Sequence, residues 1–537
     1  MIRKIYMGLF VGTMLLTTGC EQEFLDTVPT DAISEESALS NPDNMALVLN
    51  GLHRMMYGQN QLTGGTSSRS GESHFLPMFD AVGGSLIHSS PGNGWMSSDA
   101  QWTSHTTANA TTGFNLWFQR YHFVATSNAI INKVAASDFS ETPELNNILG
   151  QAHAYRAWAY SVLVTTFSKG YLIGNPSTDA GVPLLLEQGP PYDSAPRGTV
   201  QQVYDQMYID IDKAIEYLKI GSPAANKSHI SLNAAYGIKA RIALSKGDWA
   251  VAAENAALAR EGYKLLNEED WLLGFNTVNL SEVIWGGTVI ETESNYFQSY
   301  FYYVAFAFNG SLNRSNPKLI SKELYDKFPD TDYRNKAWLP LAPNTNPAAS
   351  NGQGGSFASD PNYDSKASFD AAKAAIIAEF GATKGHNTHP YMNVKFKPKN
   401  PGTTDPDDVI YMRASEMVLI EAEAKAMLGD VAGAQDALAV LGTQRDSAFD
   451  KLAFATQTAL MDEIKWQRGV ELYGEGFSYH DHIRWDEALD HTNSGASKVL
   501  YQDGFIQAKP SINDDWIFKI PQQEIDANPN ISEADQN

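Results

Sequence analysis

Two helix–turn–helix segments constrain the fold of this chain more than any other feature of the sequence. The first spans residues 231–262 and turns at Gly247; the second spans residues 411–441 and turns at Gly429. In both, apolar residues recur at helical spacing, and alanines stand where two helices would pack most closely. Each segment therefore predicts an antiparallel helix pair that must bury its apolar face against a neighbour.

Further helices are predicted outside these two pairs. Within the pairs, helices are expected at 231–245, 249–262, 411–428 and 431–441; elsewhere, at 41–57, 114–134, 145–167 and 200–218. Thr199 is the predicted N-cap of the last one. The pairs resemble tetratricopeptide-type units, which stack into a curved scaffold. Because they are not at a fixed period, we expect a mainly α fold: a tetratricopeptide-like helical scaffold with long loop and short-strand insertions.

The N-terminus has the pattern of a lipoprotein signal. Arg3 and Lys4 precede an apolar run over residues 5–16, which is shorter than the ~20 residues needed to span a bilayer but fits a signal peptide. Small residues then lead into Cys20, the single cysteine of the chain. We expect a signal peptide over 1–19 and acyl chains on Cys20, which begins a tether over 20–40. The alternative is an ordinary secretory signal with Cys20 as an unmodified thiol.

The net charge limits the possible partners of this chain, and its length limits the possible domain organisation. The formal net charge of −23 makes nucleic acid a poor partner, because binding phosphates requires Lys and Arg. At 537 residues the chain exceeds the roughly 250–300 that one core usually supports. We therefore expect residues 41–537 to form a helical domain with insertions near 59–112 and 277–408. No motif for a metal ion or a cofactor is recognisable.

The two insertions supply the candidate ligand contacts. Aromatic rings can stack on the apolar faces of a sugar, and neighbouring polar groups can hydrogen-bond its hydroxyls. The first insertion offers Asn93, Trp95 and Trp102; the second offers Tyr296 and Tyr300. Trp95, set between glycines and serines, is expected to be exposed, whereas core packing competes equally for the other three aromatics. The histidines of the first insertion, His74, His88 and His105, are expected to be polar loop residues.

A series of different short motifs is spread along the chain from one end to the other. They are residues 24–29 (FLDTVP), 154–160 (AYRAWAY), 332–334 (DYR), 411–424 (YMRASEMVLIEAEA), 468–476 (RGVELYGEG) and 520–529 (IPQQEIDANP). In number, order and spacing, this series resembles the SusD/RagB family of surface lipoproteins over nearly the whole chain. The charged residues of these motifs stand at helical spacing, so we expect structural pairs three or four residues apart.

The resemblance implies a binding function rather than catalysis. Members of this family hold oligosaccharides, occasionally peptides, at the outer-membrane surface and pass them to a TonB-dependent, SusC-like transporter. The helical repeats are expected to face the transporter, and the insertions to carry the ligand. Two alternatives stay open: a peptide-capturing protein of the RagB type, and a surface glycoside hydrolase whose paired carboxylates would come from motif residues such as Glu471 and Glu475.

Overall fold

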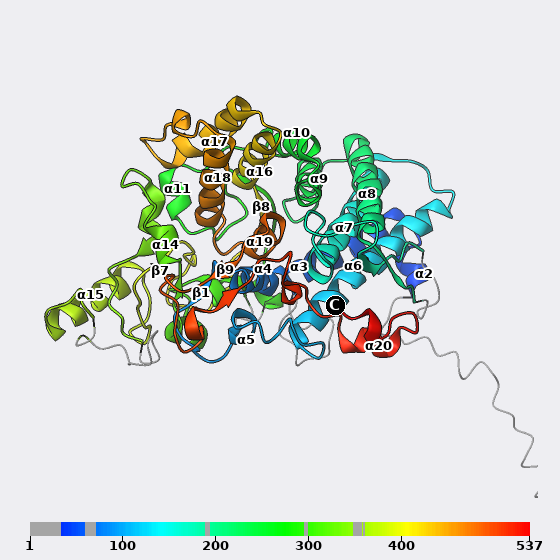
Figure 1. Cartoon of the computed structure of the whole chain (residues 1–537). Coiled ribbons are helices and arrows are strands. Elements are labelled where there is room, and N and C mark those ends of the chain that lie inside the picture. Colours follow the sequence, from blue (N-terminus) through cyan, green and yellow to red (C-terminus); the bar gives the residue numbers. More distant parts are fainter. Residues whose placement is uncertain (1–33, 59–70, 188–193, 295–298, 347–356, 358–359) are drawn as a thin grey trace, which may run out of the picture.

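The computed structural model describes residues 34–58, 71–187, 194–294, 299–346, 357 and 360–537. The predicted signal peptide over 1–19, Cys20 with most of its tether, and Tyr296 lie outside the described residues. Within them the fold is mainly α, as predicted (Figure 1). None of the described helices combines the length and the apolar character needed to cross a membrane.

All eight predicted helices form close to their expected positions. They are α3 (Pro42–Tyr57), α6 (Thr111–Ala135), α7 (Pro143–Phe167), α8 (Val200–Ile220), α9 (Leu232–Lys246), α10 (Trp249–Ala259), α16 (Ala414–Met427) and α17 (Val431–Arg445). The scaffold also contains α18 (Gln457–Glu471) and α19 (Ser478–Trp485), which the sequence analysis did not predict. Local chemistry sets their ends. Thr199 caps α8 in a capping box with Gln202, and Gly247 ends α9 at a φ of 83°, which suits glycine.

The helices pack in a succession that brings the two distant pairs together. Helix α7 packs between α6 and α8, α8 contacts α9, and α9 forms an antiparallel pair with α10. Helix α10 then packs on α16, which pairs with α17 and contacts α18. The pair α9–α10 therefore packs against the pair α16–α17, although more than 150 residues separate the two pairs in the chain.

One predicted helix begins later than expected. Residues 411–413 belong to strand β8 (Val409–Arg413), which pairs antiparallel with β4 (Val283–Gly287), and α16 starts only at Ala414. All five residues of β8 are buried. A short apolar run of this kind has no periodicity that separates strand from helix, and the partner strand decides by supplying backbone hydrogen bonds.

The insertions are more ordered than the sequence indicated. Helix α4 (Glu72–Val82) contacts α3, α12 (Tyr300–Val304) and α19 and is buried almost throughout, so the first insertion contributes to the core. The expectation of polar loop histidines is therefore wrong: His74, His88 and His105 are all buried. A four-stranded sheet joins both insertions in the order β1 (Ile87–His88), β5 (Lys318–Leu319), β7 (Met392–Asn393) and β6 (Trp338–Leu339).

The other described elements are short, apart from α15. The helices are α2 (Glu35–Ala38), α5 (Ser97–Ala100), α11 (Glu268–Leu272), α12 (Tyr300–Val304), α13 (Ser311–Ser315), α14 (Lys322–Tyr325), α15 (Lys366–Glu379) and α20 (Gln522–Ala527). Short 3-10 turns include η4 (Tyr333–Ala337). Two hairpin-like pairs complete the set, β2 (Ala180–Pro183) with β3 (Arg197–Thr199), and β9 (Leu489–Asp490) with β10 (Ile506–Gln507).

Candidate functional site

The loop that carries Asn93 and Trp95 is held tightly at its base. The Oδ1 atom of Asn316 accepts hydrogen bonds from the backbone N–H groups of Ser89 (3.0 Å) and Ser90 (3.3 Å). At Gly92, where φ is 54°, a Cβ atom would lie 2.9 Å from the Cβ of Asn316. The loop can approach α13 this closely because position 92 has no side chain.

At its tip, the loop presents an amide and an indole side by side. The Nδ2 atom of Asn93, an exposed residue, donates to Tyr302 Oη (3.2 Å) and Ser311 Oγ (3.0 Å). The Trp95 ring is partly exposed and meets the ring of Tyr302 edge-on, with 5.7 Å between centroids. A ring supported in this way keeps a fixed orientation, which suits stacking against the apolar face of a sugar.

Helix α13 adds polar groups that the sequence analysis did not single out. Ser311 contacts Asn93, and Arg314 follows it by one helical turn and is partly exposed, with Nη1 donating to Asn309 Oδ1 (3.2 Å). Guanidinium and hydroxyl groups beside an aromatic ring can hydrogen-bond sugar hydroxyls. Their helical spacing could have indicated this, but only the tertiary fold places α13 against the first insertion.

Two of the predicted ligand contacts are wrong. Trp102 is 4% exposed, and its indole N–H donates to the Val82 carbonyl (2.9 Å). Tyr300 is also 4% exposed, and its hydroxyl donates to the Gly474 carbonyl (2.8 Å). Both rings lie in the core because each polar atom finds a backbone acceptor there, so neither can stack on a ligand at the surface.

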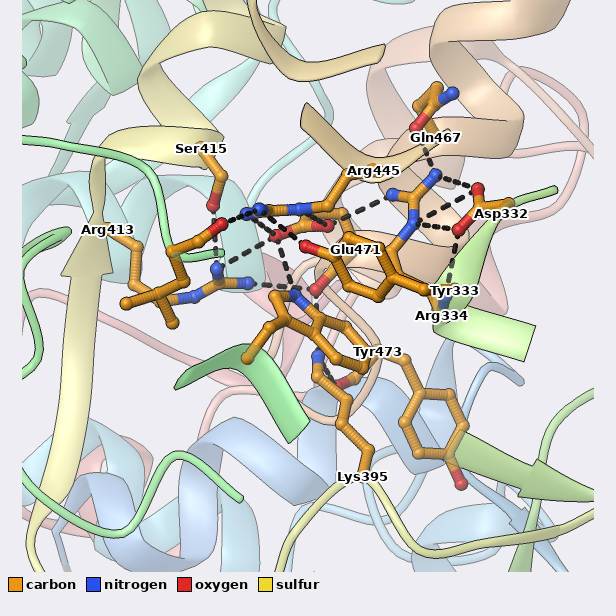
Figure 2. Close-up of polar contacts among 12 residues, drawn as sticks. Asp332, Tyr333, Arg334, Lys395, Arg413, Ser415, Arg445, Gln467, Glu471 and Tyr473 are labelled. Carbon is orange, nitrogen blue, oxygen red and sulfur yellow. Dashed lines mark hydrogen bonds and ion pairs between the residues drawn. The ribbon is translucent and has the colours of Figure 1, made fainter. Parts of the chain in front are cut away.

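The charged residues of the sequence motifs form a buried network instead of pairs within helices. Glu471 on α18 accepts hydrogen bonds from Arg334 Nη1 (3.0 Å), Arg413 Nη1 (3.0 Å) and Arg445 Nη2 (3.0 Å) (Figure 2). These arginines come from η4, β8 and α17, so the expectation of partners three or four residues apart is wrong here. Two pairs of the expected kind do form within helices: Glu421 with Lys425 on α16 (2.6 Å), and Arg484 with Asp481 on α19 (2.9 Å).

This network has the properties of a structural element. Burial alone would raise the pKa of the Glu471 carboxyl, but the guanidiniums of Arg445, Arg413 and Arg334 hold it well below its usual value. Burial would also raise the pKa of Glu475, but Arg413 and Lys395 lower it below its usual value. Both carboxylates are ionised, buried and saturated with donors, so neither is available for proton transfer to a ligand.

Among the described residues, no group of three or more histidine, cysteine, aspartate or glutamate side chains could hold a metal ion.

Comparison with known proteins identifies relatives by sequence and by fold. Residues 24–244 match the family model described as "Starch-binding associating with outer membrane", and residues 294–537 match the model of the SusD family. No curated protein matches the chain.

Several solved structures share the fold over almost their whole length. A SusD-like carbohydrate-binding protein from Bacteroides vulgatus is 23% identical, with a TM-score of 0.71 over 92% of this chain and 98% of its own. A SusD superfamily protein from Bacteroides thetaiotaomicron is 20% identical, with a TM-score of 0.71 over 93% and 99%. A laminarin-binding SusD-like protein is 19% identical, with a TM-score of 0.60 over 93% and 98%. With both family models in chain order and this fold, the chain belongs to the SusD/RagB family.

Proposed function

We propose that this protein captures oligosaccharides or polysaccharides at the cell surface and passes them to a TonB-dependent, SusC-like transporter of the outer membrane. Membership of a carbohydrate-binding family supports the ligand class. The observation that carries the proposal is the loop tip at which the partly exposed Trp95 ring stands beside the Asn93 amide and Ser311. Tyr296, outside the described residues, is proposed to extend this surface.

Membrane attachment is proposed through Cys20. Residues 1–19 would be removed as a signal peptide, and acyl chains on Cys20 would hold the tether over 20–40 at the outer membrane. Residues 41–537 would then form the helical domain, with its insertions near 59–112 and 277–408 carrying the ligand. A Cys20→Ala variant should move from the membrane fraction to the soluble fraction; membrane retention would contradict the anchor.

The proposed function involves no catalysis. A glycoside hydrolase needs two carboxylates that flank the scissile bond, one of them able to give up a proton. The motif carboxylates Glu471 and Glu475 are buried and ionised in the arginine network. This supports a scaffold role for them.

Affinity electrophoresis through gels containing single polysaccharides tests the proposal, with the lipid-free chain starting at Glu21. We expect a neutral glycan to retard the protein, and Trp95→Ala to weaken the retardation strongly. Trp249→Ala is the matched control, because Trp249 is also partly exposed but lies on α10. Equal loss of retardation in both variants would argue against a site at Trp95.

Two other outcomes would replace the proposal. Binding of oligopeptides with no retardation by any glycan would establish a peptide-capturing protein of the RagB type. Release of reducing ends over time would establish an enzyme.

A further inference from the structure

Arg314, on α13, is held by one nitrogen of its guanidinium group and leaves the other two open. Its Nη1 atom donates to Asn309 Oδ1 (3.2 Å), which also accepts from Thr383 Oγ1 (3.5 Å). Its stem lies against Gly385, where an added Cβ atom would be 3.6 Å from Arg314 Cδ. The Nε and Nη2 atoms form no hydrogen bond with the described residues and are not buried, and the side chain is partly exposed. The group is therefore oriented by the protein and has one edge open to solvent.

The open edge, Nε with Nη2, is the edge that other arginines of this protein use to bind carboxylates. In Arg241, these two atoms donate to Glu416 at 2.6 and 2.7 Å. In Arg468, they donate to Asp481 at 2.8 and 2.9 Å. The planar pair of donors matches two oxygens of a carboxylate or of a tetrahedral oxyanion, and such bidentate bonds are strong. Arg314 presents the same fork with neither atom engaged by a described residue.

No carboxylate of the described residues occupies this fork. Arg314 forms no ion pair with any of them, whereas Arg241 and Arg468 both do. The undescribed parts of the two insertions, residues 59–70, 295–298, 347–356 and 358–359, contain neither aspartate nor glutamate. Acidic residues outnumber basic ones in this chain by 62 to 39, so carboxylates are not scarce. An oriented guanidinium that none of them occupies points to an anion supplied by a ligand.

A second cation lies close to the fork. Burial lowers the pKa of His386, and the positive charges of Arg314 and Lys373 lower it further, which places both cations near the same imidazole ring. Lys373, on α15, is partly exposed and forms no ion pair within the described part of the chain. Asp370, one turn earlier on α15, already pairs with Lys366. Two positive charges near one ring favour an anion at this place.

The fork adjoins the loop tip that carries Trp95. Side chains of a helix lean towards its N-terminus, so Arg314 covers the turn of α13 that contains Ser311. The hydroxyl of Ser311 accepts from Asn93 Nδ2 (3.0 Å). One turn of an α-helix rises only ~5.4 Å, so a glycan stacked on Trp95 can bring a substituent to Arg314.

We infer that Arg314, with Lys373 nearby, binds an acidic substituent of the glycan captured at Trp95. The substituent is a carboxylate or a sulfate group, since either presents two oxygens to the edge formed by Nε and Nη2. The inference rests on the proposed function for the ligand class and adds that the preferred glycan is acidic. A neutral glycan binds through the Trp95 tip alone, whereas an acidic one gains charge-assisted hydrogen bonds at Arg314.

Matched pairs of oligosaccharides test the inference by isothermal titration calorimetry, with the lipid-free chain starting at Glu21. Oligosaccharides from pectin, alginate and glucuronoxylan carry carboxylates, and those from carrageenan and dextran sulfate carry sulfates. Each is paired with its carboxyl-reduced or desulfated form, so that only the charged group is removed. At about 0.15 M salt the Debye length is ~8 Å, and distant acidic residues of the protein contribute little. The pair that shows a difference identifies the acidic group.

We expect at least one acidic probe to bind about tenfold or more tightly than its neutral form. Arg314→Gln should remove most of that difference and leave binding of the neutral form unchanged. Arg314→Lys should keep only part of it, because lysine retains the charge without the planar fork. Lys219→Gln is the matched control, since it removes one exposed positive charge from α8, at the opposite end of the molecule from α15 (Figure 1). Trp95→Ala should weaken both forms.

Two results would overturn the inference alone. One is equal affinity of the wild type for every acidic probe and its neutral form. The other is an acidic preference that Arg314→Gln leaves intact. In both cases, neutral glycan binding that depends on Trp95 leaves the proposed function standing. Failure of every acidic and neutral probe overturns both, as does binding of oligoglutamate, an acidic peptide, in the absence of binding to any glycan.

Lys373→Gln keeps the test decisive if Arg314→Gln fails to fold. Loss of one partly exposed charge should weaken an acidic probe about two- to fivefold and leave its neutral form unchanged. Affinity for the acidic probe equal to that of the wild type would then overturn the inference.

Discussion

Replacing Glu471 by glutamine is expected to destabilise the interface at which α17, α18, β8 and η4 meet. In the native network, carboxylates and cations are balanced four to four: Glu282, Asp332, Glu471 and Glu475 face Arg334, Lys395, Arg413 and Arg445. Glu471 and the three arginines are at most about 1% exposed. A glutamine at 471 would leave one buried positive charge uncompensated and turn an N–H donor towards guanidinium donors.

The size of the effect follows from this geometry. Removing one partner of a buried, hydrogen-bonded ion pair costs roughly 3–5 kcal/mol. For a cooperative unit of 150–250 residues, that corresponds to a drop in Tm on the order of 6–20 °C. The cost should be largest near neutral pH. Because the pKa of Glu471 is held below its unfolded value, its contribution is present above about pH 4.3 and is lost as the pH falls through the folded pKa.

Thermal and urea denaturation, followed by circular dichroism at pH 7 and at pH 4, measure this contribution. Glu268→Gln is the control, since Glu268 pairs with Lys336 at 2.6 Å but both side chains are about half exposed. An exposed pair of this kind contributes about 0–1 kcal/mol. If Glu471→Gln and Glu268→Gln unfold at the same temperature, the network does not stabilise the fold and the reasoning is refuted.

Two further predictions concern single positions in the core and in the helices. Burial lowers the pKa of Lys318 to about 7. Between pH 7 and about 10.4 the unfolded chain therefore binds more protons than the folded chain. The stability of the wild type should rise with pH over this range. Lys318→Met should flatten that rise between pH 7 and 9, and parallel Tm profiles would contradict it. Gly51→Ala, inside α3 with no heavy atom within 4 Å of the added Cβ, should stabilise the protein by about 0.5–1 kcal/mol. Gly247→Ala, at a φ of 83° and 2.7 Å from Leu172 Cδ2, should destabilise it in the same melting assay, and equal shifts in both variants would refute the argument.

The helical scaffold could be predicted because its signals are local. The Asn41 side chain caps α3 by accepting from Asn44 N–H, and Thr199 caps α8 in the same way. Apolar periodicity then extends each helix from its cap. Even so, the start of α16 was misplaced, because the β8 strand depends on its pairing with β4, more than 100 residues earlier.

Which aromatic side chains face solvent could not be predicted in the same way. Trp95 and Trp102 stand seven residues apart in similar polar surroundings, yet one is partly exposed and the other lies against Trp516, with 4.6 Å between ring centroids. The Tyr300 hydroxyl finds its acceptor 174 residues away, at Gly474. Burial depends on which distant segments pack around a ring, and no local pattern contains that information.

The sequence by itself determined the helix pairs, the caps and the family, because each rests on residues close together or on motifs in a set order. Only the tertiary structure decided how the charged motif residues are used. Arg413 meets Glu282 and Glu475 across 131 and 62 residues, and their pairing depends on a shared buried environment. A cleft of about 710 Å³ between α14, α18 and α19 could not be predicted for the same reason, because its walls come from three separate stretches of chain, residues 80–85, 321–327 and 462–494.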